Sequence, residues 1–196
     1  MVSSSRSTGS FGAGNVSAVS FARNFQSVPV SLIGVSIAVA AFPVLSAAAA
    51  SGDRPAFVRT LTTNLATTAI LTSAAAVGLF ALSHVAISVL LGGGAFDAED
   101  VALTAGLLAA FALSIPLESL TQLLARAFYA THNTLIPVLA SVAGLCVIVV
   151  VGEALAPVVG VTAIPLAFTV GSLTKVAVLA ALVRSRVPRI GISPQR

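Results

Sequence analysis

Charged side chains are scarce in this chain of 196 residues, because Asp, Glu, Lys and Arg make up only 8% of it, against about 25% in soluble domains. Tryptophan is absent, and there is one tyrosine and one cysteine. The lone cysteine, Cys146, excludes an intrachain disulfide and a cysteine-based metal site. The ten Lys and Arg residues are spread along the chain and aromatic residues are few. The basic balance therefore indicates charges that orient a membrane protein, and no nucleic-acid partner.

The start of the chain lacks the apolar segment of a secretory signal peptide. Residues 1–15 are rich in Ser and Gly, whereas a signal peptide needs an apolar core after its basic start. We therefore expect a polar external segment over 1–15 and a chain that begins in a loop. The chain can equally be a whole protein or a fragment of a longer one.

Long apolar runs are what the chain has in excess. Its mean hydropathy is +1.06, and 57% of its residues are hydrophobic. About 20 helical residues cross a hydrocarbon core of about 30 Å, so each long run without Asp, Glu, Lys or Arg holds one crossing. These runs are 24–52, 60–96, 101–117, 127–152 and 154–174. The sequence predicts an all-α fold, a polytopic membrane bundle of about five transmembrane helices.

The predicted bundle covers residues 16–185, and a basic cytoplasmic tail follows over 184–196. Its spans are predicted at about 16–50, 62–83, 98–129, 135–151 and 161–183. Pro29 and Pro43 are expected to bend the first span. The second run is too long for one perpendicular crossing, so we expect a short interfacial helix over 84–91. Asp97 is expected to cap the third span, and Glu153 to Gly160 to form a loop.

The charges between the spans predict the orientation of the bundle. Gaps two and four hold only acids, namely Asp97, Glu99, Asp100 and Glu153. Gaps one, three and five hold the acid Asp53 and the basic residues Arg54, Arg59, Arg126, Arg184, Arg186, Arg189 and Arg196. By the positive-inside rule this second set faces the cytoplasm. We therefore expect an external N-terminus and a cytoplasmic C-terminus.

Polar side chains inside the spans are the candidates for function. An ionisable group in the membrane costs about 2.5 kcal/mol or more unless it meets a partner or water. Lys175 lies about 13 Å deeper along its helix than Arg184. Helical spacing gives the first span one polar face with Ser20, Asn24, Ser27 and Ser31, and the third span another with Ser114, Glu118, Gln122 and Arg126. The candidate substrate-binding residues are Arg23, Asn24, Ser27, Glu118 and Lys175.

Plainer interpretations of the same residues stay open. Glu118 and Lys175 can form a structural ion pair between helices, or Lys175 can extend to the interface. Arg23 can be an interfacial anchor, while Arg126 fits a topological charge better. The hydroxyl residues and the many Ala and Gly fit helix packing. His84 and His132 are isolated, so no metal site is expected.

No arrangement typical of an enzyme is present. The sequence shows no nucleophile with its base, no paired carboxylates and no phosphate-binding loop. We therefore expect neither a catalytic reaction nor a cofactor.

Several segments, in order, are similar to motifs of one known family of membrane proteins. Residues 22–29 with 34–38 are similar to a family stretch that ends in Leu-Pro and Gly-Val-Ala, and 42–46 resembles its Leu-Pro-x-Leu-Ser. Residues 94–100 resemble its Gly-x-Phe-Thr-x-x-Asp loop. The stretch 127–137, with Phe128-Tyr129-Ala130, Asn133-Thr134 and Pro137, resembles its Phe-Tyr-Ala element. Together these matches cover roughly residues 15–185, and in their order they resemble the second lobe of the MurJ (MviN) lipid II flippases of the MOP superfamily.

The resemblance implies two helical lobes around a central cavity, of which this chain supplies about five helices. It implies movement of an undecaprenyl-pyrophosphate-linked peptidoglycan precursor across the bacterial plasma membrane by alternating access. The partners implied are this lipid-linked precursor, membrane lipid and a complementary first lobe that the chain lacks. The family's essential arginine falls on Asn24, one residue after Arg23.

Other functions remain open from the sequence. One alternative is a flippase of another lipid-linked oligosaccharide. Another is a MATE-like, cation-coupled drug exporter with Glu118 as the coupling carboxylate. A third, from a different class, is a structural or truncated membrane protein that transports nothing.

Overall fold

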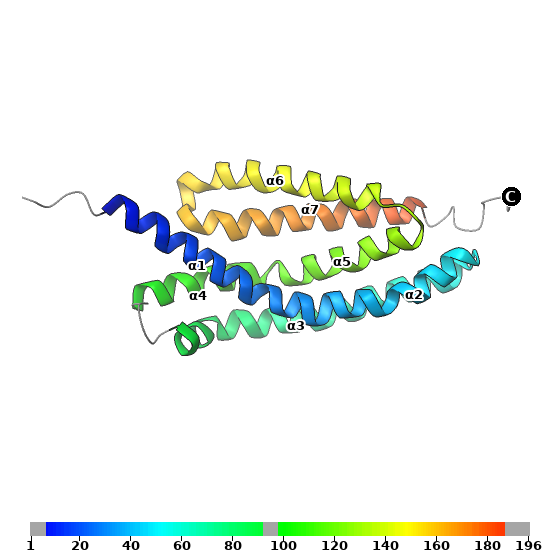
Figure 1. Cartoon of the computed structure of the whole chain (residues 1–196), viewed down its shortest axis with the longest axis horizontal. Coiled ribbons are helices and arrows are strands. Elements are labelled where there is room, and N and C mark those ends of the chain that lie inside the picture. Colours follow the sequence, from blue (N-terminus) through cyan, green and yellow to red (C-terminus); the bar gives the residue numbers. More distant parts are fainter. Residues whose placement is uncertain (1–6, 92–97, 187–196) are drawn as a thin grey trace, which may run out of the picture.

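The computed structural model describes residues 7–91 and 98–186, and over this part of the chain it consists of helices joined by short connections (Figure 1). The predicted all-α bundle is confirmed. The elements in order are α1 (Ser7–Pro29), a π-helix η1 (Val30–Val35), α2 (Ser36–Ala50), α3 (Arg54–Leu91), α4 (Ala98–Ala112), α5 (Ile115–Ala130), α6 (Leu135–Val159), a 3-10 turn η2 (Gly160–Thr162) and α7 (Ala163–Arg186).

Three helical stretches of the described residues are long and apolar enough to cross a membrane, and a bent pair forms a fourth. They are 18–50, 54–89 and 135–185, and the pair is 101–112 with 115–130, bent by 42°. The stretch 135–185 doubles back, so that α6 and α7 lie side by side in Figure 1. With 25 and 24 residues, each of these helices is about 36 Å long and can cross alone.

Two bends in the helices occur next to prolines: one between α1 and α2, visible in Figure 1, and the one between α4 and α5. Pro29 ends α1 and is followed by the π-helix η1, since proline has no N–H to donate and clashes with the preceding turn. The second bend lies at Leu113 and Ser114, just before Pro116 in the first turn of α5. Buried Gln26, near the end of α1, donates a 3.1 Å hydrogen bond to the Ser114 hydroxyl. The two bends therefore lie against each other inside the bundle.

Small residues allow the helices to approach closely. A side chain on Gly34 of η1 would meet Ser119 of α5, with its Cβ only 2.6 Å from the Ser119 Cβ. At the contact of α6 with α7, a Cβ on Gly171 would lie 2.3 Å from the Ile148 Cγ1 and 2.8 Å from the Gly144 carbonyl oxygen. Such approaches are typical of membrane helix pairs, where packing replaces the hydrophobic effect.

The helices extend beyond several of the predicted spans. The helix α1 begins at Ser7, within the expected polar segment, and α3 continues to Leu91 without the expected separate interfacial helix. The expected loop after Glu153 is helical to Val159, and the chain turns at Gly160, which has a φ of +59°. Apolar composition indicates where a helix lies in lipid, but helices can project beyond it. Asp97 and the tail 187–196 lie outside the described residues.

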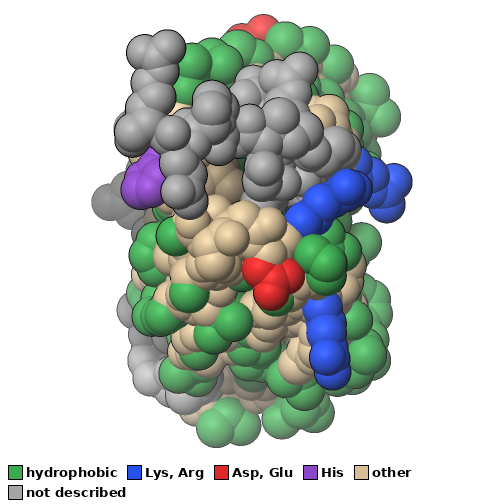
Figure 2. All heavy atoms as spheres, turned by 90° about the vertical axis from the view of Figure 1, so that its right-hand side faces the viewer, with side chains coloured by type: hydrophobic (Ala, Val, Ile, Leu, Met, Phe, Trp, Pro, Cys, Tyr) green, Lys and Arg blue, Asp and Glu red, His purple; other side chains and the backbone are tan. Residues whose placement is uncertain are grey.

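The α2–α3 loop, the α5–α6 loop and the end of α7 lie at one end of the bundle, on the right of Figure 1. At this end Asp53 caps α3, accepting a 3.0 Å hydrogen bond from the Ala56 N–H, and Asn133 likewise accepts one of 3.2 Å from Ile136. Figure 2 shows basic side chains on this face with an acidic group near them. The end of α3, the start of α4, the α6–α7 connection and the start of α1 lie at the other end.

Candidate functional site

Glu118 and Lys175 form an ion pair between α5 and α7. The Glu118 side chain is 16% exposed and the Lys175 side chain is 14% exposed, so both are largely buried between the helices. The hydroxyl of buried Ser172 donates a second hydrogen bond, of 2.5 Å, to the same Glu118 Oε1. Glu118 lies in the first turn of α5, where a negative charge is stabilised by the helix dipole. The sequence-based possibility of an ion pair is thus realised, and Lys175 does not extend to the interface.

The aromatic ring of Phe168 joins Arg23 to this pair. The Arg23 Cζ lies 5.5 Å from the ring centroid, and the Lys175 Nζ lies 5.7 Å from it. Both distances are within the range of cation–π attraction. Phe111 of α4 packs edge-on against Phe168, with the ring centroids 5.8 Å apart. Phe168 is therefore a shared platform that contacts one cation from α1 and one from α7.

Three of the five candidate residues, Arg23, Glu118 and Lys175, are brought together in this way. Asn24 and Ser27 are not: both are exposed on α1, where the Ser27 hydroxyl donates a 2.7 Å hydrogen bond to the Asn24 carbonyl oxygen. Within the described part of the chain, neither side chain bonds to the Glu118–Lys175 pair. They share with Arg23 the outward-facing side of α1.

Phe168 and Ser172 are site residues that the sequence reasoning did not select. The signal was available, because Phe168, Ser172 and Lys175 have the spacing i, i+4 and i+7 that places residues on one face of a helix. Gln26 was also overlooked, although an amide inside an apolar span needs a partner just as a charge does. The candidates were selected by charge and by the polar faces of the first and third spans, and Gln26, Phe168 and Ser172 lie on neither face.

Arg126 of α5 has a different aromatic partner. Arg126 stacks on Phe42 of α2, with its Cζ 5.8 Å from the ring centroid. The described residues contain no group of three or more His, Cys, Asp or Glu placed to hold a metal ion.

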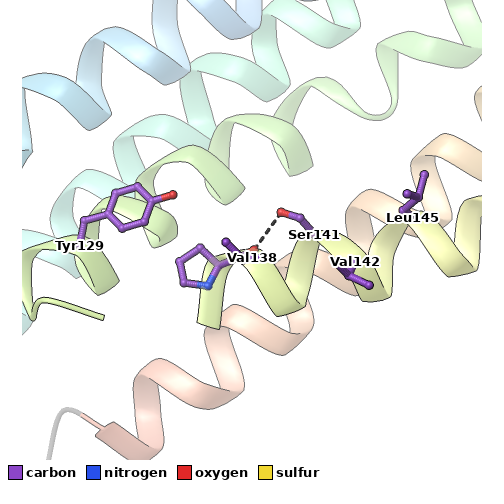
Figure 3. Close-up of a pocket in the computed structure, with 6 residues that line it drawn as sticks. Tyr129, Val138, Ser141, Val142 and Leu145 are labelled. Atoms are coloured by element: carbon purple, nitrogen blue, oxygen red, sulfur yellow. Dashed lines mark hydrogen bonds between the residues drawn. The ribbon is translucent and has the colours of Figure 1, made fainter. Parts of the chain in front are cut away.

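A shallow groove of about 270 Å³ lies outside the cluster, between the end of α5 and α6. Its lining is Tyr129, Pro137, Val138, Ser141, Val142 and Leu145. Figure 3 shows Tyr129 reaching from α5 towards α6, where the Ser141 hydroxyl is already bonded to the Pro137 carbonyl oxygen at 2.8 Å. The groove is mostly apolar and carries no charge, so it offers no site for a charged headgroup.

Comparison with known proteins identifies relatives over almost the whole chain. The sequence model of the family described as "Lipid II flippase MurJ" matches residues 2–194. The probable lipid II flippase MurJ of Bdellovibrio bacteriovorus is 31% identical over 92% of this chain and 34% of its own length. The lipid II flippase MurJ of Burkholderia cenocepacia is 28% identical over 82% of this chain and 31% of its own length.

A solved structure has the same fold. The lipid II flippase MurJ in an inward closed conformation superposes with a TM-score of 0.78 and 25% sequence identity. The match covers 91% of this chain and 38% of that one. The chain thus spans about a third of the length of the curated relatives it matches.

Proposed function

Because the chain belongs to the lipid II flippase MurJ family, we propose that it is part of a flippase that carries lipid II, a lipid-linked peptidoglycan precursor, across the bacterial plasma membrane. The observation that carries the proposal is the family match over residues 2–194, combined with the cations Arg23 and Lys175 on one aromatic ring of a helical membrane bundle. The activity is transport, and no chemical step is assigned to any residue.

The chemistry of the cluster suits a pyrophosphate headgroup. Arginine and lysine are the side chains that bind phosphate groups most strongly, and they do so best where water is partly excluded. Arg23 and Lys175 would supply the charges, Glu118 would balance them, and Asn24 and Ser27 on the open side of α1 would supply hydrogen bonds. The bends at Pro29 and Ser114 would let the helices around this site rock in alternating access.

The exposed polar side of α1 supports a complementary first lobe as the partner. Arg23, Asn24 and Ser27 are exposed in this chain, and a charge facing lipid is costly. The relatives are about three times as long as the part matched here. We therefore propose that this side of α1 faces a cavity formed with a first lobe that the chain itself does not supply.

We also propose that the end carrying the α2–α3 loop faces the cytoplasm. Arg54 and Arg59 lie in the first two turns of α3, which begins at this end, while Glu153 lies in the last two turns of α6, which runs to the opposite end. The positive-inside rule then gives a cytoplasmic end to α7 and an external start to α1.

Complementation tests the function directly. Cells depleted of their own lipid II flippase would express the chain together with a separately encoded first lobe of a relative, and growth would be measured. Growth is expected with the natural chain and is expected to fail with Arg23→Ala or Lys175→Ala. Arg126→Ala is the matched control, since it also removes an arginine from an aromatic ring.

Membrane levels of each variant would be measured by immunoblot, because loss of protein would indicate a purely structural pair. Normal growth with both Arg23→Ala and Lys175→Ala would rule out this site. Rescue by the 196-residue chain without any first lobe would contradict the two-lobe proposal and indicate a homodimeric transporter.

A further inference from the structure

The charges at the Phe168 platform do not balance. Two cations, Arg23 and Lys175, lie near one ring, but only one carboxylate, Glu118, is close to them. That carboxylate pairs with Lys175, and no carboxylate among the described residues lies within ion-pair distance of Arg23. The cluster therefore has one cation that is neutralised internally and one that is not.

The packing around Lys175 indicates which partner of the pair can move. The stem of Lys175 fills the space over Gly144 of α6, where a Cβ on the glycine would lie 2.6 Å from the Lys175 Cγ. The lysine is thereby held against the α6–α7 contact. Glu118 instead lies directly after the bend at Ser114, in the first turn of α5. An incoming anion would therefore displace the carboxylate and leave the ammonium group where it is.

We propose that Glu118 is the internal counter-anion of this site, which a phosphate headgroup must displace from Lys175, and that this competition selects a doubly charged pyrophosphate over a singly charged phosphate. The inference deepens the proposed function and rests on it. The chemical class selected is a pyrophosphate diester, whatever its lipid or sugar.

The selection follows from counting charge pairs. When a singly charged phosphate replaces Glu118 at Lys175, one ion pair forms and one is broken. The displaced carboxylate is then left without a cation inside the bundle, where an unpaired charge is unfavourable. A pyrophosphate can contact Lys175 and Arg23 together, so it gains a second pair while displacing the same carboxylate. Ser172 remains as a hydrogen-bond donor to the displaced Glu118.

The test measures binding of two small diesters to the purified full chain in lipid nanodiscs by isothermal titration calorimetry. One is pyrophosphate with one methyl ester on each phosphate group, which carries two negative charges. The other is dimethyl phosphate, which carries one. The proteins are the natural chain, Glu118→Gln and Glu153→Gln. The last is the matched control, because Glu153 is an exposed glutamate on α6, away from the cluster.

The natural chain is expected to bind the pyrophosphate diester at least about tenfold more tightly than dimethyl phosphate, because it forms one more ion pair, and a tenfold ratio corresponds to about 1.4 kcal/mol. Glu118→Gln is expected to bind dimethyl phosphate about tenfold more tightly than the natural chain does, because no carboxylate has to be displaced, so that the preference falls. Glu153→Gln should keep the natural preference. Glu118→Asp has a shorter side chain that reaches Lys175 less well, so its preference should lie between those of the natural chain and Glu118→Gln. It replaces Glu118→Gln in the test if that variant does not fold.

An unchanged preference in folded Glu118→Gln and Glu118→Asp, an equal change in Glu153→Gln, or no binding of either diester would overturn the inference. Its failure is distinct from failure of the proposed function. If the selectivity follows Glu118 but complementation fails, the lipid II assignment is wrong and the counter-anion stands. If complementation succeeds but the preference ignores Glu118, the counter-anion alone is wrong.

Discussion

Replacing Gly171 by alanine should destabilise the bundle, whereas the same change at Gly78 should not. A Cβ at position 171 would lie 2.3 Å from the Ile148 Cγ1 and 2.8 Å from the Gly144 carbonyl oxygen, well inside the 3.5–4.0 Å of ordinary carbon contacts. Ile148 can rotate, but the backbone oxygen cannot. The helices α6 and α7 would therefore have to move apart at their closest contact.

The size of the effect follows from two opposing terms. Alanine is better than glycine in a helix by about 1 kcal/mol, while overpacking of a close contact costs about 1–3 kcal/mol. At Gly171 the second term is expected at its upper end, because backbone is involved, which leaves a net loss of about 1–2 kcal/mol. At Gly78 nothing lies within 4 Å of the added Cβ, so only the gain of about 1 kcal/mol remains.

The free energy of unfolding would be measured by SDS titration in mixed micelles, followed by far-UV circular dichroism, because the chain has no tryptophan for fluorescence. The test compares the signs of the two changes in the free energy of unfolding. The SDS-unfolded state affects both values, but it affects their signs less. If Gly171→Ala proves as stable as Gly78→Ala, α6 and α7 do not approach as closely as described.

Two further predictions concern the ion pair and the orientation. Lys175→Met and Glu118→Leu should each lower the free energy of unfolding by about 2 kcal/mol, because each leaves a lone charge in the bundle. The double variant should lose much less than the sum in the same titration, and additive losses would show that the pair contributes nothing. With Cys146 replaced by Ser, a cysteine at Ala98 should react with an impermeant thiol reagent in intact cells and one at Ala56 should not, because we propose that the end of the bundle with Arg54 and Arg59 faces the cytoplasm. Labelling only at Ala56 would reverse the proposed orientation.

The sequence was sufficient to predict the all-α membrane bundle and the family, because a segment that crosses lipid must be apolar and must pair its backbone groups within the helix. It also indicated that Glu118 and Lys175 needed partners, and they are each other's partner. Charge in an apolar span is rare enough that the number of possible pairs was small.

The contacts between neutral residues were not predictable in the same way. Helical periodicity places Gln26 on one face of α1, but it does not tell which residue of which helix meets that face, here Ser114. Glycine and alanine occur throughout the chain, so the close approach at Gly144 and Gly171 has no distinctive pattern. The π-helix after Pro29 is a third case, since proline predicts a bend without predicting how the backbone accommodates it.

The pair formed by Glu118 and Lys175 has a consequence for the synthesis of the protein. The two residues are 57 positions apart, so at 5–20 residues per second the ribosome adds Lys175 roughly 3–11 s after Glu118. Throughout that delay α5 carries a carboxylate whose cation does not yet exist. We expect α5 to stay beside the insertion machinery, and to settle into lipid only when α7 emerges and brings the lysine to it.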